Sequence, residues 1–188
     1  MESVVRYQFN QCVERYGGQY WMKTFSCWEQ LLAMAFGQLS FRESLRDIVV
    51  CLNAQQDKLY HLGFRSFMVL TTLSRANEKR DWRIYRDYAN LLIAEARKLY
   101  AGDKPFNLEL EGTVYVIDST TIELCLNIFP WARLKKVRAS VKLHLAMELK
   151  GSIPAFFHIS DGKTSDFDFL DILEFEAGAY YTMDRGYV

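Results

Sequence analysis

The sequence predicts an α+β protein in which a helical amino-terminal region precedes a region built from β-strands. Through the first hundred residues the apolar side chains recur at intervals of three and four, which is typical of helices. After the segment Ala101–Pro105 the pattern changes to alternation with many β-branched residues, which indicates strands. The chain has 188 residues, half of them hydrophobic, enough for a folded core. We expect residues 1–105 to form a helical domain, DNA-binding or accessory, and residues 106–188 a second domain.

Helix starts are visible in the first region. Ser26 with Glu29, and Ser40 with Glu43, have the spacing of capping boxes, and Asp81 can cap a later helix. Two helices joined by a short turn that contains glycine are compatible with a helix-turn-helix. Any small helical bundle gives the same pattern, and this simpler interpretation is the one we favour.

The second region predicts the order strand, strand, strand, helix, strand. The expected strands are Thr113–Ile117, Ser140–Leu149, Ile153–Ile159 and Tyr180–Met183, and the expected helix is Asp166–Phe175. Turn residues separate these segments.

Two acids stand at the predicted strand ends, Asp118 in VYVIDSTTIEL and Asp184 in YYTMDRGYV. Either acid alone is most often a turn former. The order of elements, however, is that of a ribonuclease-H-like domain, in which the first and fourth strands lie side by side and bring such acids together. Two adjacent carboxylates repel one another, and a hard divalent cation relieves the repulsion. We therefore predict that Asp118 and Asp184 are catalytic residues that hold Mg²⁺, with Mn²⁺ as a substitute.

The formal net charge is zero, yet cations gather in two basic islands, at residues 65–86 and 131–142. Such clusters favour a phosphate backbone, although either island alone is also compatible with an ordinary solvated surface. We predict that the chain binds double-stranded DNA. The predicted contacts are Arg75, Lys79, Arg80, Arg83, Arg133, Lys135, Lys136, Arg138, Lys142 and Arg185.

Other residues leave alternatives open. Trp131 is compatible with stacking on an unpaired base and with covering a sheet edge. In the alternating segment 140–149, Lys142 and His144 fall on the polar face, so we expect a surface histidine, with a phosphate contact as the alternative. His158 lies in an apolar strand and suits a core histidine with a hydrogen-bond partner.

Several classes of protein are disfavoured. The longest apolar runs fall well short of the roughly 20 residues of a membrane span, and the start lacks a signal-peptide pattern. The four cysteines are scattered without a CxxC pair, which favours reduced core thiols over a structural zinc site. We expect a cytoplasmic protein with no membrane partner.

Four motifs together resemble the DDE-type transposases of bacterial insertion sequences, specifically insertion sequence family four. They are Asp118-Ser119-Thr120-Thr121, Lys142-Leu143-His144, Asp161-Gly162-Lys163 with Asp166, and Asp184-Arg185-Gly186-Tyr187. Upstream, LRDIVVCLN, LYHLGF and RANEKRDWRIY resemble the amino-terminal domain of such enzymes. The resemblance covers essentially the whole chain.

The resemblance implies DNA transposition. The intact enzyme would hydrolyse a phosphodiester at the element's end and transfer the freed 3′-hydroxyl strand to target DNA by two-metal catalysis, as a homodimer at the bacterial nucleoid.

Family members also carry a third carboxylate, a glutamate in a Tyr-Arg-Glu-Lys pattern after the last strand, and no such pattern follows Asp184. From this we expect a partial ribonuclease-H-like domain in a truncated chain that does not cut DNA. The alternatives are an inactive DNA-binding or dimerising remnant that interferes with a full-length transposase, and a ribonuclease-H-like nuclease unrelated to transposition.

Overall fold

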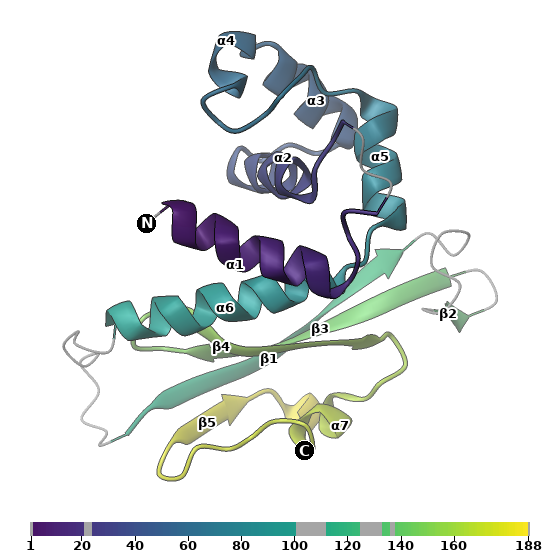
Figure 1. The fold of residues 1–188 in the computed structure, drawn as a ribbon. Coiled ribbons are helices and arrows are strands. Elements are labelled where there is room, and N and C mark those ends of the chain that lie inside the picture. Colours follow the sequence, from purple (N-terminus) through teal and green to yellow (C-terminus); the bar gives the residue numbers. More distant parts are fainter. Residues whose placement is uncertain (1, 21–23, 101–111, 125–132, 136–137, 188) are drawn as a thin grey trace. The chain divides into compact units, whose positions relative to one another are not determined.

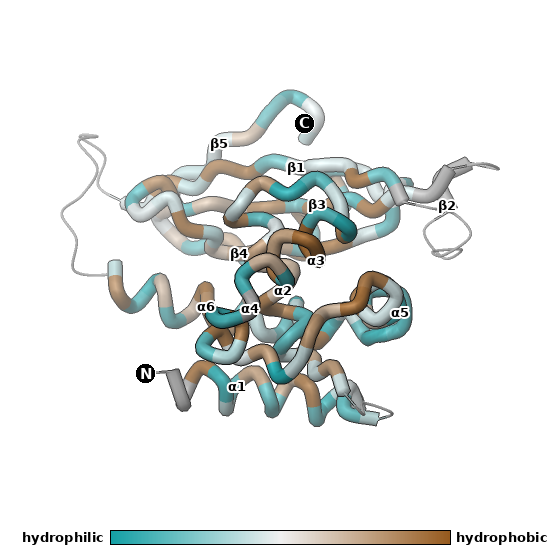
Figure 2. Tube along the Cα trace, turned by 90° about the horizontal axis from the view of Figure 1, so that it is seen from above, coloured by the Kyte–Doolittle hydropathy of each residue, from teal (hydrophilic) through white to brown (hydrophobic). Residues whose placement is uncertain are grey.

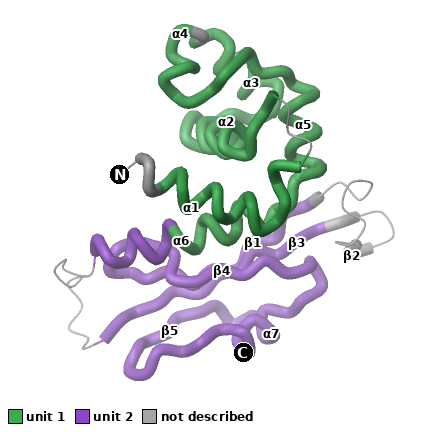
Figure 3. The backbone as a smooth tube through the Cα atoms, viewed as in Figure 1, with its two compact units in different colours: residues 1–91 green, residues 92–188 purple. Residues whose placement is uncertain are grey.

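The structure is a computed structural model that describes residues 2–20, 24–100, 112–124, 133–135 and 138–187. The chain divides into two compact units, residues 1–91 and residues 92–188 (Figure 3). This division falls within a long helix, and the domain boundary expected near residue 105 stays a prediction.

The described part of the amino-terminal region is helical, as the sequence predicts. The helices are α1 (Glu2–Arg15), α2 (Cys27–Leu39), α3 (Leu45–Asn53), α4 (Gln56–Leu59), α5 (Leu70–Lys79) and α6 (Arg83–Tyr100) (Figure 1). No helix in the described ranges is both long enough and apolar enough to cross a membrane.

The first predicted capping box is confirmed and the second is wrong. Ser26 accepts a hydrogen bond from the Glu29 backbone, and the Glu29 carboxylate accepts one from the Ser26 backbone. Ser40 instead ends α2, because its hydroxyl donates to the Phe36 carbonyl at 2.6 Å. The cap of α3 is Ser44, whose hydroxyl accepts from the Asp47 backbone at 3.1 Å.

Two apolar clusters hold unit 1 together. One joins α1, the start of α2 and the first part of α6 through Phe9, Val13, Cys27, Ile84 and Tyr88. The other joins α2, α3, α4 and α5 with the segment after α4; its members are Ala33, Ile48, Val49, Leu52, Leu59, Phe64, Met68 and Leu73. Both follow from the helical spacing of apolar residues, because each helix buries one stripe against its neighbours.

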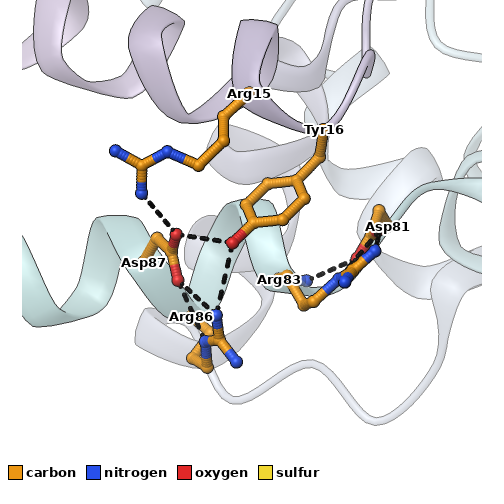
Figure 4. A network of polar contacts seen from close by, with 6 residues as sticks. All are labelled: Arg15, Tyr16, Asp81, Arg83, Arg86 and Asp87. Carbon is orange, nitrogen blue, oxygen red and sulfur yellow. Dashed lines mark hydrogen bonds and ion pairs between the residues drawn. The ribbon is translucent and has the colours of Figure 1, made fainter.

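A half-buried carboxylate, that of Asp87, links α1 to α6 at the edge of the first cluster (Figure 4). Asp87 accepts hydrogen bonds from Arg15 at 2.7 Å, from the Tyr16 hydroxyl at 2.8 Å and from Arg86 at 2.7 Å. Its side chain is only 14% exposed. Burial raises the pKa of Asp87, but the hydrogen bonds from Arg86, Tyr16 and Arg15 outweigh it, so the pKa lies below its ordinary value.

We predict that Asp87→Asn destabilises the fold by about 1–3 kcal/mol at pH 7, because a neutral amide replaces a carboxylate that pairs with two arginines. A carboxyl whose pKa is depressed on folding stabilises above its unfolded pKa of about 3.9 and loses this effect as pH falls through the folded pKa. The difference between wild type and variant should therefore shrink at acid pH. Urea denaturation at several pH values measures it.

The matched control is Glu95→Gln, which removes an exposed i,i+3 pair with Lys98. It should change stability by less than about 0.5 kcal/mol. Equal effects of the two substitutions would contradict the importance of the Asp87 network.

Unit 2 is a mixed sheet with a short covering helix. Its elements are β1 (Val114–Leu124), β2 (Arg133–Lys135), β3 (Arg138–Glu148), β4 (Ile153–Asp161), α7 (Asp166–Leu170), β5 (Tyr180–Met183) and the 3-10 turn η2 (Arg185–Tyr187). The sheet order is β2-β3-β1-β5, with β4 also paired to β3. The β1–β3 and β3–β4 pairs are antiparallel and β5 is parallel to β1. These features give an α+β fold consistent with a partial ribonuclease-H-like domain, as the sequence predicts.

The elements differ in extent from the prediction. β1 does not end at Asp118 but continues to Leu124, because its β-branched residues keep pairing with β3 as far as Leu124 and Ala139. The short strand β2 was not predicted. The helix α7 ends at Leu170, earlier than expected.

The two faces of the sheet differ less than alternation suggests, because the apolar face of β3 is only partly buried and the polar face contains its fully buried residues. Apolar and polar residues are interspersed along β1 and β3 (Figure 2). The face that carries Ile117, His144 and Ala146 is the buried one, because Phe169 of α7 packs on it. The expectation of a surface position for His144 is therefore wrong.

Candidate functional site

The two predicted acids lie next to each other in the sheet. The parallel register pairs Val116 with Thr182 and Ile117 with Met183, and Asp118 and Asp184 are the next residues of the two strands. Adjacent strands are about 4.8 Å apart, so the two carboxylates flank the point where β5 ends. Both residues are exposed. The structure thus brings the pair together, whereas their binding of metal stays a prediction.

Local backbone donors orient each carboxylate. Oδ1 of Asp118 accepts from the Ser119 backbone at 2.8 Å, and Oδ1 of Asp184 accepts from the Gly186 backbone. Each carboxylate can therefore present its second oxygen to an external ligand.

Gly186 is required for the space that it leaves rather than for a left-handed backbone. The backbone φ of Gly186 is not positive, so residues other than glycine could adopt its conformation. A Cβ at this position would stand 3.0 Å from Asp184 Oδ1 and 3.8 Å from Asp166 Oδ2. A side chain at this position would therefore push the Asp184 carboxylate away by a few tenths of an ångström.

Asp166, at the first position of α7, is the site residue that sequence reasoning missed. Its Oδ1 lies 3.3 Å from the Lys142 ammonium and 3.6 Å from His144 Nδ1. The capping box of Ser165 and Asp168 marks the start of α7 in the sequence and was the available signal for its position. The packing of α7 against η2, which places Asp166 near Asp184, has no signature in the sequence.

Tyr187 was also missed as a site residue. Its side chain is buried, and its hydroxyl makes no hydrogen bond of normal geometry within the described residues. Burial raises the pKa of Tyr187, the Ser119 hydroxyl opposes the rise, and the carboxylates of Asp166, Asp118 and Asp184 add to it. The Tyr187 hydroxyl therefore lies within electrostatic range of the three carboxylates.

The predicted DNA contacts of the second basic island are placed by their backbone alone. Arg133 and Lys135 lie in β2 and Arg138 begins β3, while Lys136 and Trp131 lie outside the described residues. Lys142 is paired with Asp166 and only 15% exposed. Its contact with DNA stays a prediction.

The other predicted contacts fall into two groups. Arg75 and Lys79 are exposed on α5 and help to line a cavity of about 620 Å³ in unit 1, and Arg185 is exposed in η2. By contrast, Arg80 donates to the carbonyls of Ser26 and Phe25 and to Gln30, and Arg83 pairs with Asp81 at 2.6 Å. These last two arginines are held in structural contacts.

Asp118 and Asp184 together suit a cation whose remaining ligands come from a bound phosphodiester. Within the described residues, no group of three or more His, Cys, Asp or Glu side chains is placed to hold a metal ion. Asp118 and Asp184 nonetheless supply the hard oxygen donors that Mg²⁺ prefers, and Mg²⁺ is commonly held by one or two carboxylates together with water and phosphate. The donor set therefore fits a divalent ion that binds with a phosphodiester.

Comparison with known protein families agrees with this chemistry. Residues 109–188 match the family model described as "Transposase DDE domain", and residues 1–65 match the one described as "Domain of unknown function (DUF4372)". Searches of curated proteins and of solved structures gave no match. The DDE match, which contains Asp118 and Asp184, supports a transposase that acts in DNA transposition. Transposase DDE domains use divalent metal ions and act on DNA.

We predict that Gly186→Ala weakens Mn²⁺ binding about tenfold, because the added Cβ crowds Asp184 Oδ1 and shifts the carboxylate. Isothermal titration of the full chain with Mn²⁺ measures the affinity. Thermal unfolding of the same variant controls for the fold. Wild-type Mn²⁺ affinity in a folded variant would contradict the positioning inferred here.

Proposed function

We propose that the chain is part of a transposase whose intact form carries out the DNA-cleavage and strand-transfer steps of transposition, with Asp118 and Asp184 as the metal-holding catalytic residues. The observation that carries the proposal is the register of β1 and β5, which makes the two acids neighbours within the region that matches a transposase DDE domain. Bound divalent ions would activate a water or 3′-hydroxyl and stabilise the leaving oxygen of a phosphodiester. Mg²⁺ is the proposed ion, with Mn²⁺ as a substitute.

The protein residues hold the ions and the DNA in this proposal. Asp118 lies within β1 and Asp184 directly follows β5, so two adjacent strands, which are more rigid than loops, hold the two acids. Arg185, one residue beyond Asp184 and exposed, is close enough in sequence to reach a phosphate of the strand at the site. The cations of β2 and the start of β3 would contact neighbouring phosphates.

The remaining parts of the proposal concern organisation. Residues 1–105 serve as the DNA-binding or accessory region and residues 106–188 as the catalytic domain, in a homodimer that works at the bacterial nucleoid. The competing function, from a different class, is a chain that binds DNA or dimerises without cutting and so interferes with a full-length transposase. The next experiment separates the two.

We predict that Asp118→Asn and Asp184→Asn each lower transposition by at least about a hundredfold, because each removes a charge that positions the metal. The measurement is the transposition frequency of the gene in its genomic setting, with its flanking DNA. The control is Asp171→Asn, an exposed acid at the end of α7 that should leave the frequency unchanged. A wild-type gene that does not transpose, but suppresses a related active element, would favour the competing function.

We also predict that Arg75 and Lys79 contribute to DNA binding through electrostatic attraction to phosphates and do not contribute to the stability of the fold. The double variant Arg75→Ala/Lys79→Ala should reduce the slope of log affinity against log salt by up to about 0.9 per lost phosphate contact. Its thermal stability should stay near that of the wild type, because both side chains are exposed. Fluorescence anisotropy with a DNA duplex measures the slope, and an unchanged slope removes these two residues from the interface.

A further inference from the structure

A group of charged and polar side chains lies under α7, near Asp184. It consists of Lys142 and His144 of β3 and Asp166 of α7, and we call it the Asp166 cluster. Lys142 and His144 project from the sheet face that α7 covers, and His144 is fully buried. Its ring stacks on Phe169 with centroids 4.8 Å apart and an interplanar angle of 9°.

The positive charge in the cluster belongs to Lys142. Burial lowers the pKa of His144, Asp166 opposes this effect, and Lys142 and His158 add to it, so the pKa lies below its ordinary value. His144 is therefore neutral at pH 7. Its Nε2 is 3.0 Å from the Ser160 hydroxyl, and its Nδ1 faces Asp166 Oδ1. The ion pair that remains is Lys142 with Asp166.

The Asp166 carboxylate has one oxygen toward this ammonium and the other toward Asp184. One of its oxygens, Oδ1, faces Lys142 at 3.3 Å. The other, Oδ2, faces the site of Gly186, which Asp184 Oδ1 also approaches. A lysine ammonium on a flexible stem close to Asp184 would compete with a divalent cation unless another carboxylate held it.

We propose that Asp166 is a positioning residue that keeps the Lys142 ammonium beneath α7, so that the Asp184 carboxylate stays open to a divalent cation. The proposal rests on the proposed function, because it concerns the same carboxylate pair. In this proposal Asp166 and Lys142 together determine how tightly the site binds its divalent cation.

A direct coordinating role for Asp166 is the opposing interpretation. It would place a divalent ion close to the Lys142 ammonium, and the two cations would repel one another. The cluster geometry therefore favours charge compensation over coordination. The two interpretations also predict different results for the same set of variants.

The test is a double-mutant cycle on Mn²⁺ affinity, measured on the full chain by isothermal titration and by electron paramagnetic resonance of free Mn²⁺. Asp166→Asn frees the ammonium and should weaken Mn²⁺ binding by about three- to tenfold. Lys142→Met leaves an extra negative charge near the pair and should tighten binding by a similar factor. The double variant should return to within about twofold of the wild type, since a net neutral pair has been removed.

Three results would overturn the proposal. A double variant as weak as Asp166→Asn would make Asp166 a direct ligand. Weakening by both single variants would indicate a merely structural cluster. No effect of either single variant on Mn²⁺ affinity would show that the cluster does not act on the site.

Two further variants complete the design. Lys142→Arg keeps the charge and should retain wild-type affinity, and melting curves confirm that each variant is folded. Asp118→Asn tests the proposed function separately, because it removes a ligand outside the cluster. If Asp118→Asn leaves Mn²⁺ affinity unchanged, the metal site itself is wrong; if it weakens binding while the cycle fails, only the role of Asp166 is wrong.

Discussion

The parallel pairing of β5 with β1 is the contact on which the candidate site depends. These strands are the first and the last of the sheet unit along the chain, and no local turn brings them together. A parallel pair needs a long connection, which β3, β4 and α7 provide. Only because the register runs through Ile117 and Met183 do the following acids become neighbours. A shift of one position would turn one carboxylate to the other face of the sheet.

The candidate site also depends on α7, the short helix that covers one face of the sheet. Five residues of α7 place Phe169 in the apolar cluster of the sheet and Asp166 beside a charged strand residue. The same face thus combines an apolar centre with a polar margin. The margin lies next to the carboxylates, where fixed charges influence a bound ion most strongly.

Much of this arrangement could be predicted from the sequence, for identifiable reasons. Alternation and turn residues located three of the strands, β3, β4 and β5, to within a few residues, and the order of elements led to the adjacency of Asp118 and Asp184. The burial of His144 could not be predicted, because alternation separates two faces but does not say which one a helix covers. Asp166 and Tyr187 were missed for a related reason: their importance arises from the packing of α7 against η2, which is a tertiary contact.

The pairing of β5 with β1 joins two segments that are far apart in the sequence, and this separation affects the order in which the strands pair during folding. The β1–β3 and β3–β4 pairs join segments closer in sequence, whereas β5 must find β1 after the intervening chain has formed, at a higher cost in loop entropy. We therefore expect the acids to meet late in the folding of this unit. A cation that binds both acids would stabilise that stage and no earlier one, so that metal loading and completion of the sheet become a single event.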